Sequence, residues 1–264
     1  MKYLSLDEIH FAEAEMLRWL YAICKEKGIP LCLGGGTLLG AIRHKGFIPW
    51  DDDIDLMIPR SSYDELIDIL EKTVDDKYEV VSMRDGKSMF SYAKIIEKTV
   101  FLDKSSREVT SNLWIDIFPV DGLPEDPKKM HSAFKKAKLY RMWLSVSMSN
   151  DLNAGSRLKR LLKPIVIIPA KIIGARKWLL KLDRLCRKIG FGNTKYVGVL
   201  CGGYGKRECM PYADWVNYSE AEFEGDKYAI PGCWDYYLTS LYGNYMELPP
   251  EDKRKTHSVI AYRK

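Results

Sequence analysis

Two aspartates are spaced so that they could form a metal site. Asp53 and Asp55 are separated by one residue in the run 53–58, which alternates polar and apolar side chains as strands do. Their carboxylates would therefore share one face of the strand, where they repel each other unless a cation lies between them. Oxygen-rich sites of this kind suit Mg²⁺ or Mn²⁺.

A third acid, Asp116, stands between two isoleucines in another apolar run. A lone acid within a buried strand is costly unless it has a partner. The arrangement that avoids this cost brings Asp116 beside the pair, so we predict Asp53, Asp55 and Asp116 as the catalytic and metal-binding residues. The competing interpretation is that residues 51–55 form an acidic surface turn.

A glycine-rich turn precedes the acids. Residues 29–33 are mostly apolar and typical of a buried strand, and three glycines follow before a helix that begins at Thr37. Such a turn often ends a strand without binding anything, but together with the Asp-x-Asp strand it indicates a phosphate site. Gly35 and Gly36 allow close approach of the backbone, and the free N–H groups near Thr37 suit an anion.

Several basic residues are close to these motifs in sequence. Arg43, His44 and Lys45 lie between the helix and the acidic strand, where they either contact phosphate oxygens or form a solvated basic turn. Lys94 lies in the apolar strand 92–96, from which it either reaches into the site or lies on the solvated face.

Periodicity predicts an α+β fold with a catalytic core over residues 1–125. A helical and aromatic-rich part over residues 126–264 is expected to pack on this core and bind the acceptor and headgroup. Apolar spacing, cap residues and prolines predict the elements along the chain. The expected helices cover 6–27, 37–43, a segment capped by Ser61 or Ser62 and ending at Leu70, 128–146, and one or two within 156–188; the expected strands cover 29–33, 53–58, 78–83, 89–96, 100–103 and 113–120.

The segment 35–56 resembles the signature of the LicD family, which is related to fukutin, and 114–122 and 242–250 extend the resemblance. It implies a nucleotidyltransferase-like mixed sheet flanked by helices. It also implies transfer of phosphocholine from CDP-choline to a sugar hydroxyl of teichoic acid, lipopolysaccharide or a capsule precursor, with release of CMP. Other relatives transfer phosphoribitol or phosphoglycerol from a CDP donor.

The resemblance also implies roles for individual residues. Asp53 and Asp55 would bind the metal ion, and Asp116 would be a ligand or the base. Gly35, Gly36 and Thr37 would hold the donor phosphate, and Lys94 would lie in the site. Asn244 stands where many relatives carry an acid, which leaves that position without an assigned role.

Aromatic side chains are frequent after residue 196, and aromatic faces hold a quaternary ammonium well. Trp215, Trp234 and Tyr237 are the candidates for a choline pocket, although most aromatic residues of this region are expected in the core. His257 is a candidate for a proton-transfer or phosphate contact, with an ordinary surface histidine as the alternative.

The net charge of +5 is unevenly distributed. Residues 128–188 contain 17 Lys and Arg against two acids, so this segment carries +15 and the rest of the chain −10. The stretch 157–188 is either a basic helix pair or an element that lies on anionic lipid, which would suit a lipid-linked acceptor. We do not expect a nucleic-acid partner, because the acidic remainder would repel phosphates.

The remaining features predict an ordinary globular protein. Of the 264 residues 46% are hydrophobic and 29% charged, and the six cysteines lack the spacing of a zinc site. With no signal-like start, we expect a cytoplasmic protein with free thiols, located at the inner face of the membrane if it contacts lipid. The alternatives to the proposed chemistry are nucleotidyl transfer to protein or RNA and a non-catalytic glycan-binding protein on the same fold.

Overall fold

The computed structural model describes residues 1–84, 86, 88–103, 111–149, 167–254 and 259–264. Within these residues, nine strands form one mixed sheet and two more form a hairpin, β9 (Ser219–Phe223) and β10 (Asp226–Ile230). The main path of the sheet is β1-β11-β5-β6-β3-β2, with β4 beside β5 and β7 and β8 extending from β6. The strands of this sheet are β1 (Lys2–Tyr3), β2 (Cys32–Leu33), β3 (Asp55–Pro59), β4 (Tyr78–Val81), β5 (Ala93–Leu102), β6 (Asn112–Leu123), β7 (Tyr196–Gly198), β8 (Cys209–Pro211) and β11 (Ala261–Arg263).

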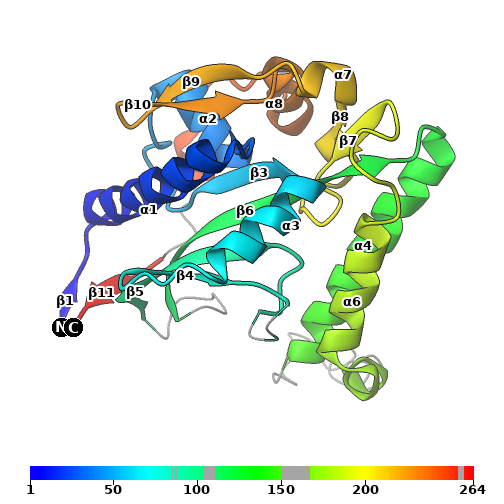
Figure 1. Ribbon diagram of the computed structural model, residues 1–264, viewed down its shortest axis with the longest axis horizontal. Coiled ribbons are helices and arrows are strands. Elements are labelled where there is room, and N and C mark those ends of the chain that lie inside the picture. The colour runs from blue at the N-terminus through cyan, green and yellow to red at the C-terminus, as the bar shows by residue number, and fades with distance from the viewer. Residues whose placement is uncertain (85, 87, 104–110, 150–166, 255–258) are drawn as a thin grey trace.

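Helices flank this sheet, so the predicted α+β fold with a mixed sheet is confirmed (Figure 1). Helix α1 packs against β6, whereas α3 packs against β3, β4 and β6. The two chain ends lie side by side, because β1 pairs with β11. The helices are α1 (Leu6–Lys27), α2 (Gly35–His44), α3 (Arg60–Leu70), α4 (Pro127–Met148), α6 (Ala175–Cys186), α7 (Tyr212–Trp215) and α8 (Trp234–Tyr242), with 3₁₀ turns η1 (Gly205–Glu208) and η2 (Glu251–Lys253).

Helix α1 has the ends that its sequence predicts. The Ser5 hydroxyl accepts the backbone N–H of Glu8, and the Glu8 carboxylate accepts the backbone N–H of Ser5. Gly28 ends the helix at φ 67°, a left-handed conformation that glycine adopts without a steric penalty. The long helix is therefore fixed at both ends, and its apolar stripe faces the sheet.

Other boundaries differ from the prediction. Helix α3 already begins at Arg60 and has no side-chain cap, so the expected caps Ser61 and Ser62 are wrong; both lie inside its first turn. The two strands expected at 89–96 and 100–103 are one strand, β5, which pairs with β6 through a register shift between Ile96 and Phe101.

Residues from the C-terminal half complete the sheet. Strands β7, β8 and β11 belong to it, and α4 lies beside α6 at the end of the molecule opposite the termini (Figure 1). Both predicted parts therefore contribute strands to one sheet, and the expected division at residue 125 stays a prediction. Of the basic stretch 157–188, residues 157–166 lie outside the described residues, as does His257.

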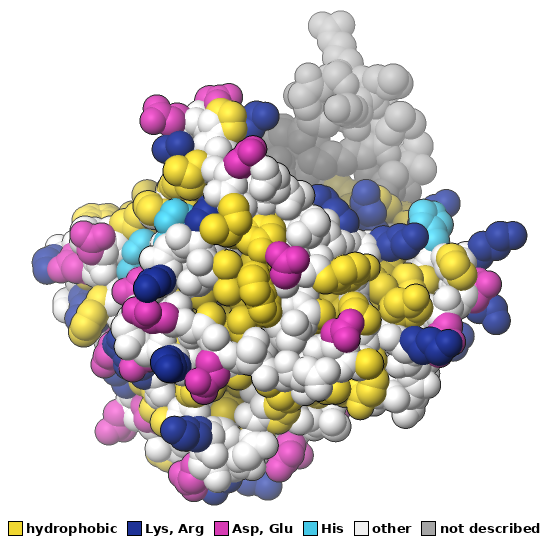
Figure 2. Space-filling model, turned by 90° about the horizontal axis from the view of Figure 1, so that it is seen from above, with side chains coloured by type: hydrophobic (Ala, Val, Ile, Leu, Met, Phe, Trp, Pro, Cys, Tyr) yellow, Lys and Arg dark blue, Asp and Glu magenta, His cyan; other side chains and the backbone are white. Residues whose placement is uncertain are grey.

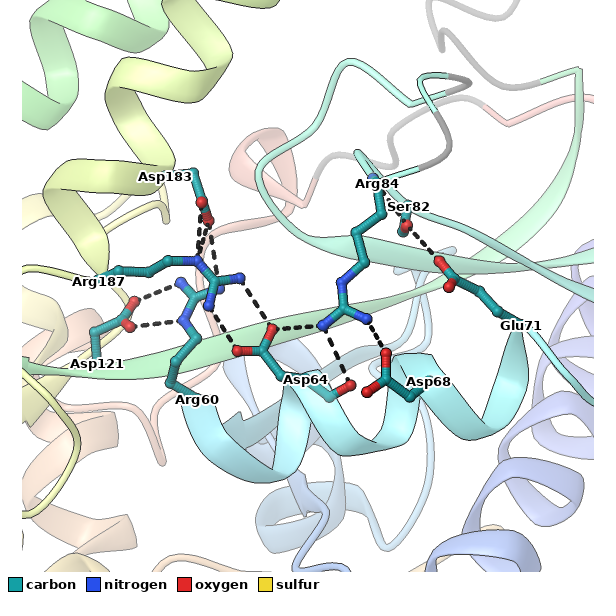
Figure 3. Close-up of polar contacts among 9 residues, drawn as sticks. All are labelled: Arg60, Asp64, Asp68, Glu71, Ser82, Arg84, Asp121, Asp183 and Arg187. Carbon is teal, nitrogen blue, oxygen red and sulfur yellow. Dashed lines mark hydrogen bonds and ion pairs between the residues drawn. The ribbon is translucent and has the colours of Figure 1, made fainter.

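A partly buried ion-pair network links α6 to the core (Figure 3). Arg60 of α3 donates two hydrogen bonds of 2.7 Å to the Asp121 carboxylate of β6, and its guanidinium also lies 3.6 Å from Asp183 of α6. Arg187 bridges Asp183 to Asp64 of α3. Since Arg60 and Asp121 are buried, breaking either side of their pair would leave an uncompensated charge in the interior.

All six cysteines lie in described residues, and each is a free, buried thiol. The prediction that they form no disulfide framework is confirmed. Among the described residues, no helix combines the length and the apolar character that crossing a bilayer requires.

Candidate active site

Three charged residues form a row across neighbouring strands. Asp55 of β3 is the register partner of Asp116 of β6, and Asp116 is in turn the partner of Lys94 of β5. Cross-strand partners point to the same face of a sheet. The structure thus brings Asp55 and Asp116 together as predicted, and it places Lys94 in the site rather than on a solvated face.

Lys94 forms a buried ion pair with Asp116. Its Nζ lies 2.7 Å from Asp116 Oδ1, and the lysine is only 1% exposed. The ammonium also lies 4.4–5.5 Å from the ring centroids of Phe90, Tyr92 and Trp114, which favour a cation over their faces. The ion pair is therefore enclosed by aromatic rings.

Asp53 precedes β3 by two residues and is half-buried. Asp52 beside it is buried, and its carboxylate accepts the backbone N–H of Val259 at 2.9 Å. Residues 51–55 are therefore not the acidic surface turn that was the competing interpretation.

The acids influence one another's protonation. Burial raises the pKa of Asp55, and the negative charges of Asp53 and Asp116 raise it further. Burial also raises the pKa of Asp116 to about 6, although the Lys94 ammonium works in the opposite direction. Mutual repulsion of this kind is what a bound cation would relieve.

The glycine turn lies directly against the acids. Gly35 has φ 48°, and a Cβ there would lie 2.5 Å from Asp55 Oδ2; a Cβ at Gly36 would lie 2.7 Å from Asp51 Oδ2. The Thr37 hydroxyl accepts the backbone N–H of Asp55 at 2.8 Å. The three predicted phosphate residues thus form the N-terminus of α2 beside the acidic row, where the helix dipole favours an anion.

The basic residues at the C-terminal end of α2 form other contacts. Arg43 donates to the backbone carbonyl of Tyr245 at 2.7 Å and to the His44 imidazole at 2.9 Å, and it thereby holds the loop that follows α8. Lys45 is exposed and lies 3.6 Å from Glu222. The structure does not bring these side chains to the acidic row, and their predicted phosphate role stays a prediction.

A cavity of about 50 Å³ adjoins the row on the side of the C-terminal half. Of the predicted choline-binding residues, Tyr237 lines it. Trp215 is instead fully buried against Phe191 and Tyr218, and Trp234 is half-buried against the core. The lining of the small cavity is Gly34, Gly35, Asp55, Met57, Phe118, Val199, Gly202, Gly203, Tyr204, Glu208 and Tyr237.

Sequence reasoning missed Glu208, which is 3% exposed and receives a hydrogen bond of 3.2 Å from the Tyr237 hydroxyl. Burial raises its pKa to about 7, against the lowering effect of the Tyr237 hydrogen bond and of Arg141 and Arg207. No local pattern in the sequence singles this glutamate out, because the residues that surround it come from distant segments.

Glu13 is the second residue that sequence reasoning missed. It is 1% exposed, and neither carboxylate oxygen has a hydrogen-bond partner among the residues that the structure describes. Burial raises its pKa well above the usual value, and Asp53, Asp52 and Asp51 raise it further. Its signal was available, because Glu13 falls within the apolar stripe of the helix 6–27.

A second, larger cavity of about 620 Å³ shares Phe118, Gly202 and Gly203 with the small one. Apart from the Arg141 side chain, its lining is uncharged and largely apolar. The other residues that line it are Met89, Phe90, Ser91, Tyr92, Leu144, Ser145, Met148, Ser149, Leu182 and Cys201.

The donor set suits a hard divalent cation, because carboxylate oxygens are its preferred ligands. The buried oxygens of Glu13 without hydrogen bonds agree with a cation nearby. As the described side chains stand, no three acidic, histidine or cysteine side chains group closely enough to hold a metal ion. Asp116 turns toward Lys94, whereas Asp55 lies against Gly35, so ligation requires both carboxylates to converge.

Comparison with known proteins agrees with this geometry. Residues 28–146 match the family model described as the LicD/FKTN/FKRP nucleotidyltransferase domain. The chain is 31% identical over 264 residues to the lipopolysaccharide cholinephosphotransferase LicD of Haemophilus influenzae, covering 98% of each chain. A stretch of 44 residues, 17% of this chain, is 46% identical to 9% of the ribitol 5-phosphate transferase FKRP of Mus musculus and of Homo sapiens.

Proposed function

This chain belongs to the LicD family of phosphotransferases, and on that premise we propose that it transfers phosphocholine from CDP-choline to a sugar hydroxyl of a cell-surface glycan, releasing CMP. The observation that carries the proposal is the row of Asp55, Asp116 and Lys94 beside the glycine-rich start of α2. Such a row can place anionic phosphate between helix N–H groups and an acidic metal site.

The acids and the glycine turn would have different roles in such a transfer. Asp53, Asp55 and Asp116 would hold Mg²⁺ or Mn²⁺, which when bound neutralises the donor diphosphate and stabilises the leaving CMP. The backbone N–H groups of Gly35 and Gly36 would orient donor phosphate oxygens at the start of α2. Catalysis then rests on positioning and charge stabilisation of an in-line transfer.

Phosphoribitol transfer is the second candidate, because the short segment shared with the ribitol 5-phosphate transferase is more similar than the chain as a whole is to LicD. The acceptor we propose is a teichoic acid, lipopolysaccharide or capsule precursor, because the full-length relative is named for lipopolysaccharide. The donor alcohol separates the two candidates, since choline is a cation and ribitol a neutral polyol.

CMP release tests the proposal. The full chain is incubated with CDP-choline, CDP-ribitol or CDP-glycerol, in Mg²⁺ or in EDTA, with and without an N-acetylgalactosamine-containing glycan. We expect release from CDP-choline that needs Mg²⁺ and disappears in Asp53→Asn. Release from CDP-ribitol alone would show that the transferred group is phosphoribitol rather than phosphocholine. No release from any donor, with nucleotide binding indifferent to EDTA, would contradict the enzyme and favour a glycan-binding protein.

We also propose that the basic stretch 157–188 contacts the cytoplasmic face of a membrane that carries a lipid-linked acceptor. Ile168 and Ile172 are 58% and 77% exposed, and Lys171 lies between them in sequence. Figure 2 shows further Lys and Arg side chains gathered at the end of the molecule where α4 lies. Apolar side chains among lysines suit an anionic bilayer surface.

Co-sedimentation tests this contact with vesicles of phosphatidylglycerol, or of phosphatidylcholine as the neutral control, at low salt. We expect binding to the anionic vesicles that weakens with salt and in Ile168→Asn/Ile172→Asn. No sedimentation with anionic vesicles would rule the contact out.

A further inference from the structure

The transfer needs a group that takes the proton from the attacking hydroxyl, and Asp116 is poorly suited to that task. Its carboxylate forms an ion pair with Lys94, whose ammonium is enclosed by three aromatic rings. Protonation of Asp116 would leave that ammonium buried without its counter-charge, which is strongly unfavourable. A different acceptor is therefore needed.

Glu208 is a buried carboxylate that, among the described residues, forms hydrogen bonds but no ion pair. It lies in the wall of the small cavity together with Asp55, at the end of η1. The Tyr237 hydroxyl of α8 donates to Oε2, which fixes the orientation of the carboxylate. Oε1 lies against Gly202, where a Cβ would lie 2.6 Å from it, so a glycine is needed for this close approach.

Gly202 also connects Glu208 to the larger cavity. Gly202, Gly203 and Phe118 line both cavities, so the wide cavity adjoins the small one that Asp55 and Glu208 line. Phe118 and Tyr92 lie with their ring centroids 4.3 Å apart in the wall of the wide cavity, a platform for the apolar face of a sugar ring. A sugar bound there would present a hydroxyl toward Glu208.

We propose that Glu208 is the general base of this protein and that the larger cavity receives the acceptor sugar. The inference rests on the proposed transfer. The hydroxyl oxygen forms a bond to the phosphorus of the phosphocholine group, and the bond from that phosphorus to the oxygen of CMP breaks. CMP leaves with the electron pair, and the hydroxyl proton moves to the Glu208 carboxylate.

The electrostatic surroundings agree with this role. The groups that face Glu208 are Arg141 of α4, Arg207 of η1, Asp55 of β3, the backbone N–H of Tyr204 and the hydroxyl of Tyr237. Burial raises the pKa of Glu208, whereas the hydrogen bonds and the two arginines lower it, and the resulting pKa is about 7. Glu208 can therefore bind and release a proton near neutral pH.

The first test is Glu208→Gln in the full chain, with CDP-choline, Mg²⁺ and an N-acetylgalactosamine glycoside as acceptor. Removal of a general base lowers kcat by at least about 100-fold. We expect this loss together with a KM for CDP-choline within about twofold of the wild type, because the donor phosphates bind elsewhere. Glu220→Gln, an exposed glutamate of β9, is the matched control and should keep wild-type kcat.

The pH profile separates a base from a structural residue. In the wild type, kcat/KM should rise with pH through a limb near pH 7, and this limb should vanish in Glu208→Gln. Tyr237→Phe removes a hydrogen bond that lowers the pKa of Glu208, so it should move the limb to higher pH. This second variant keeps the idea falsifiable if Glu208→Gln does not fold.

A kcat of Glu208→Gln within about threefold of the wild type, or a limb that Tyr237→Phe leaves in place, would overturn the assignment. A more acidic, fluorinated acceptor hydroxyl should restore part of the loss in Glu208→Gln, since it needs less help from a base. A different result would contradict the proposed function itself: wild-type protein that neither binds nor turns over any CDP-alcohol. In that case the assignment of Glu208 as the base would also fall.

Discussion

Lys94 and Asp116 face each other across β5 and β6, with Lys94 Nζ 2.7 Å from Asp116 Oδ1 in the interior of the protein. The pair orients the middle acid of the site and keeps its carboxylate ionised despite burial, because the ammonium lowers the pKa of Asp116. Lys94 is thus a positioning residue for the acidic row.

Replacing Lys94 by methionine should destabilise the fold and inactivate the enzyme together. Loss of one partner of a buried ion pair costs about 3–5 kcal/mol. The free energy of unfolding, measured in urea, should fall by that amount. Lys2→Met, which breaks an exposed pair with Glu8, should change it by less than about 1 kcal/mol. A Lys94→Met protein as stable as the wild type would contradict the buried pair.

The Arg60–Asp121 pair should matter for stability rather than for chemistry. Arg60→Met leaves Asp121 buried without its partner and should lower the free energy of unfolding by about 3–5 kcal/mol. The kcat per folded molecule should stay near the wild-type value, since neither residue lines the two cavities. Asp68→Asn, at the exposed end of the same network (Figure 3), should be nearly neutral.

Two glycines with positive φ offer a matched comparison. Gly28→Ala should cost about 1 kcal/mol from backbone strain alone, because no atom of the described residues lies within 4 Å of the added Cβ. Gly35→Ala carries the same strain and drives a Cβ to 2.5 Å from Asp55 Oδ2, so it should also lower kcat by about 100-fold or more. Equal activities of the two variants would show that Asp55 does not depend on the turn.

Stability should depend on the protonation of Glu208. Its pKa rises from 4.5 to about 7 on folding, so its contribution is fully present below pH 4.5 and is lost as the pH rises through 7. The free energy of unfolding of the wild type, relative to Glu208→Gln, should therefore fall by about 3 kcal/mol between pH 4.5 and 8. Urea unfolding at several pH values measures this difference. A constant difference would show that the carboxylate is not desolvated.

Local patterns predicted much of the site. Period-two alternation predicted that Asp53 and Asp55 share a face, which stays a prediction because β3 begins only at Asp55. The cost of a lone buried acid indicated that Asp116 must join Asp55. The structure places Asp116 beside Asp55 as register partners. These features could be predicted from the sequence because each depends on neighbouring residues in the chain or on a general energetic rule.

Contacts between distant segments could not be predicted from the sequence in this way. Glu208 of η1 and Tyr237 of α8 come together with Asp55 only in the folded protein, where all three line one cavity. Trp215 is aromatic like Tyr237, yet it is buried in the core. The register shift in β5 likewise follows from its pairing with β6 rather than from its own residues. Composition therefore indicated aromatic candidates but could not tell which of them line a cavity.

The central claim is that this protein moves a phospho-alcohol, and the product shows this most directly. Mass spectrometry of an N-acetylgalactosamine-containing glycan, after incubation with CDP-choline and Mg²⁺, should reveal a mass gain of one phosphocholine group. The gain should be absent in EDTA and in Asp53→Asn. A glycan that carries CMP instead would show nucleotidyl transfer, and an unchanged glycan alongside intact CDP-choline would contradict the account.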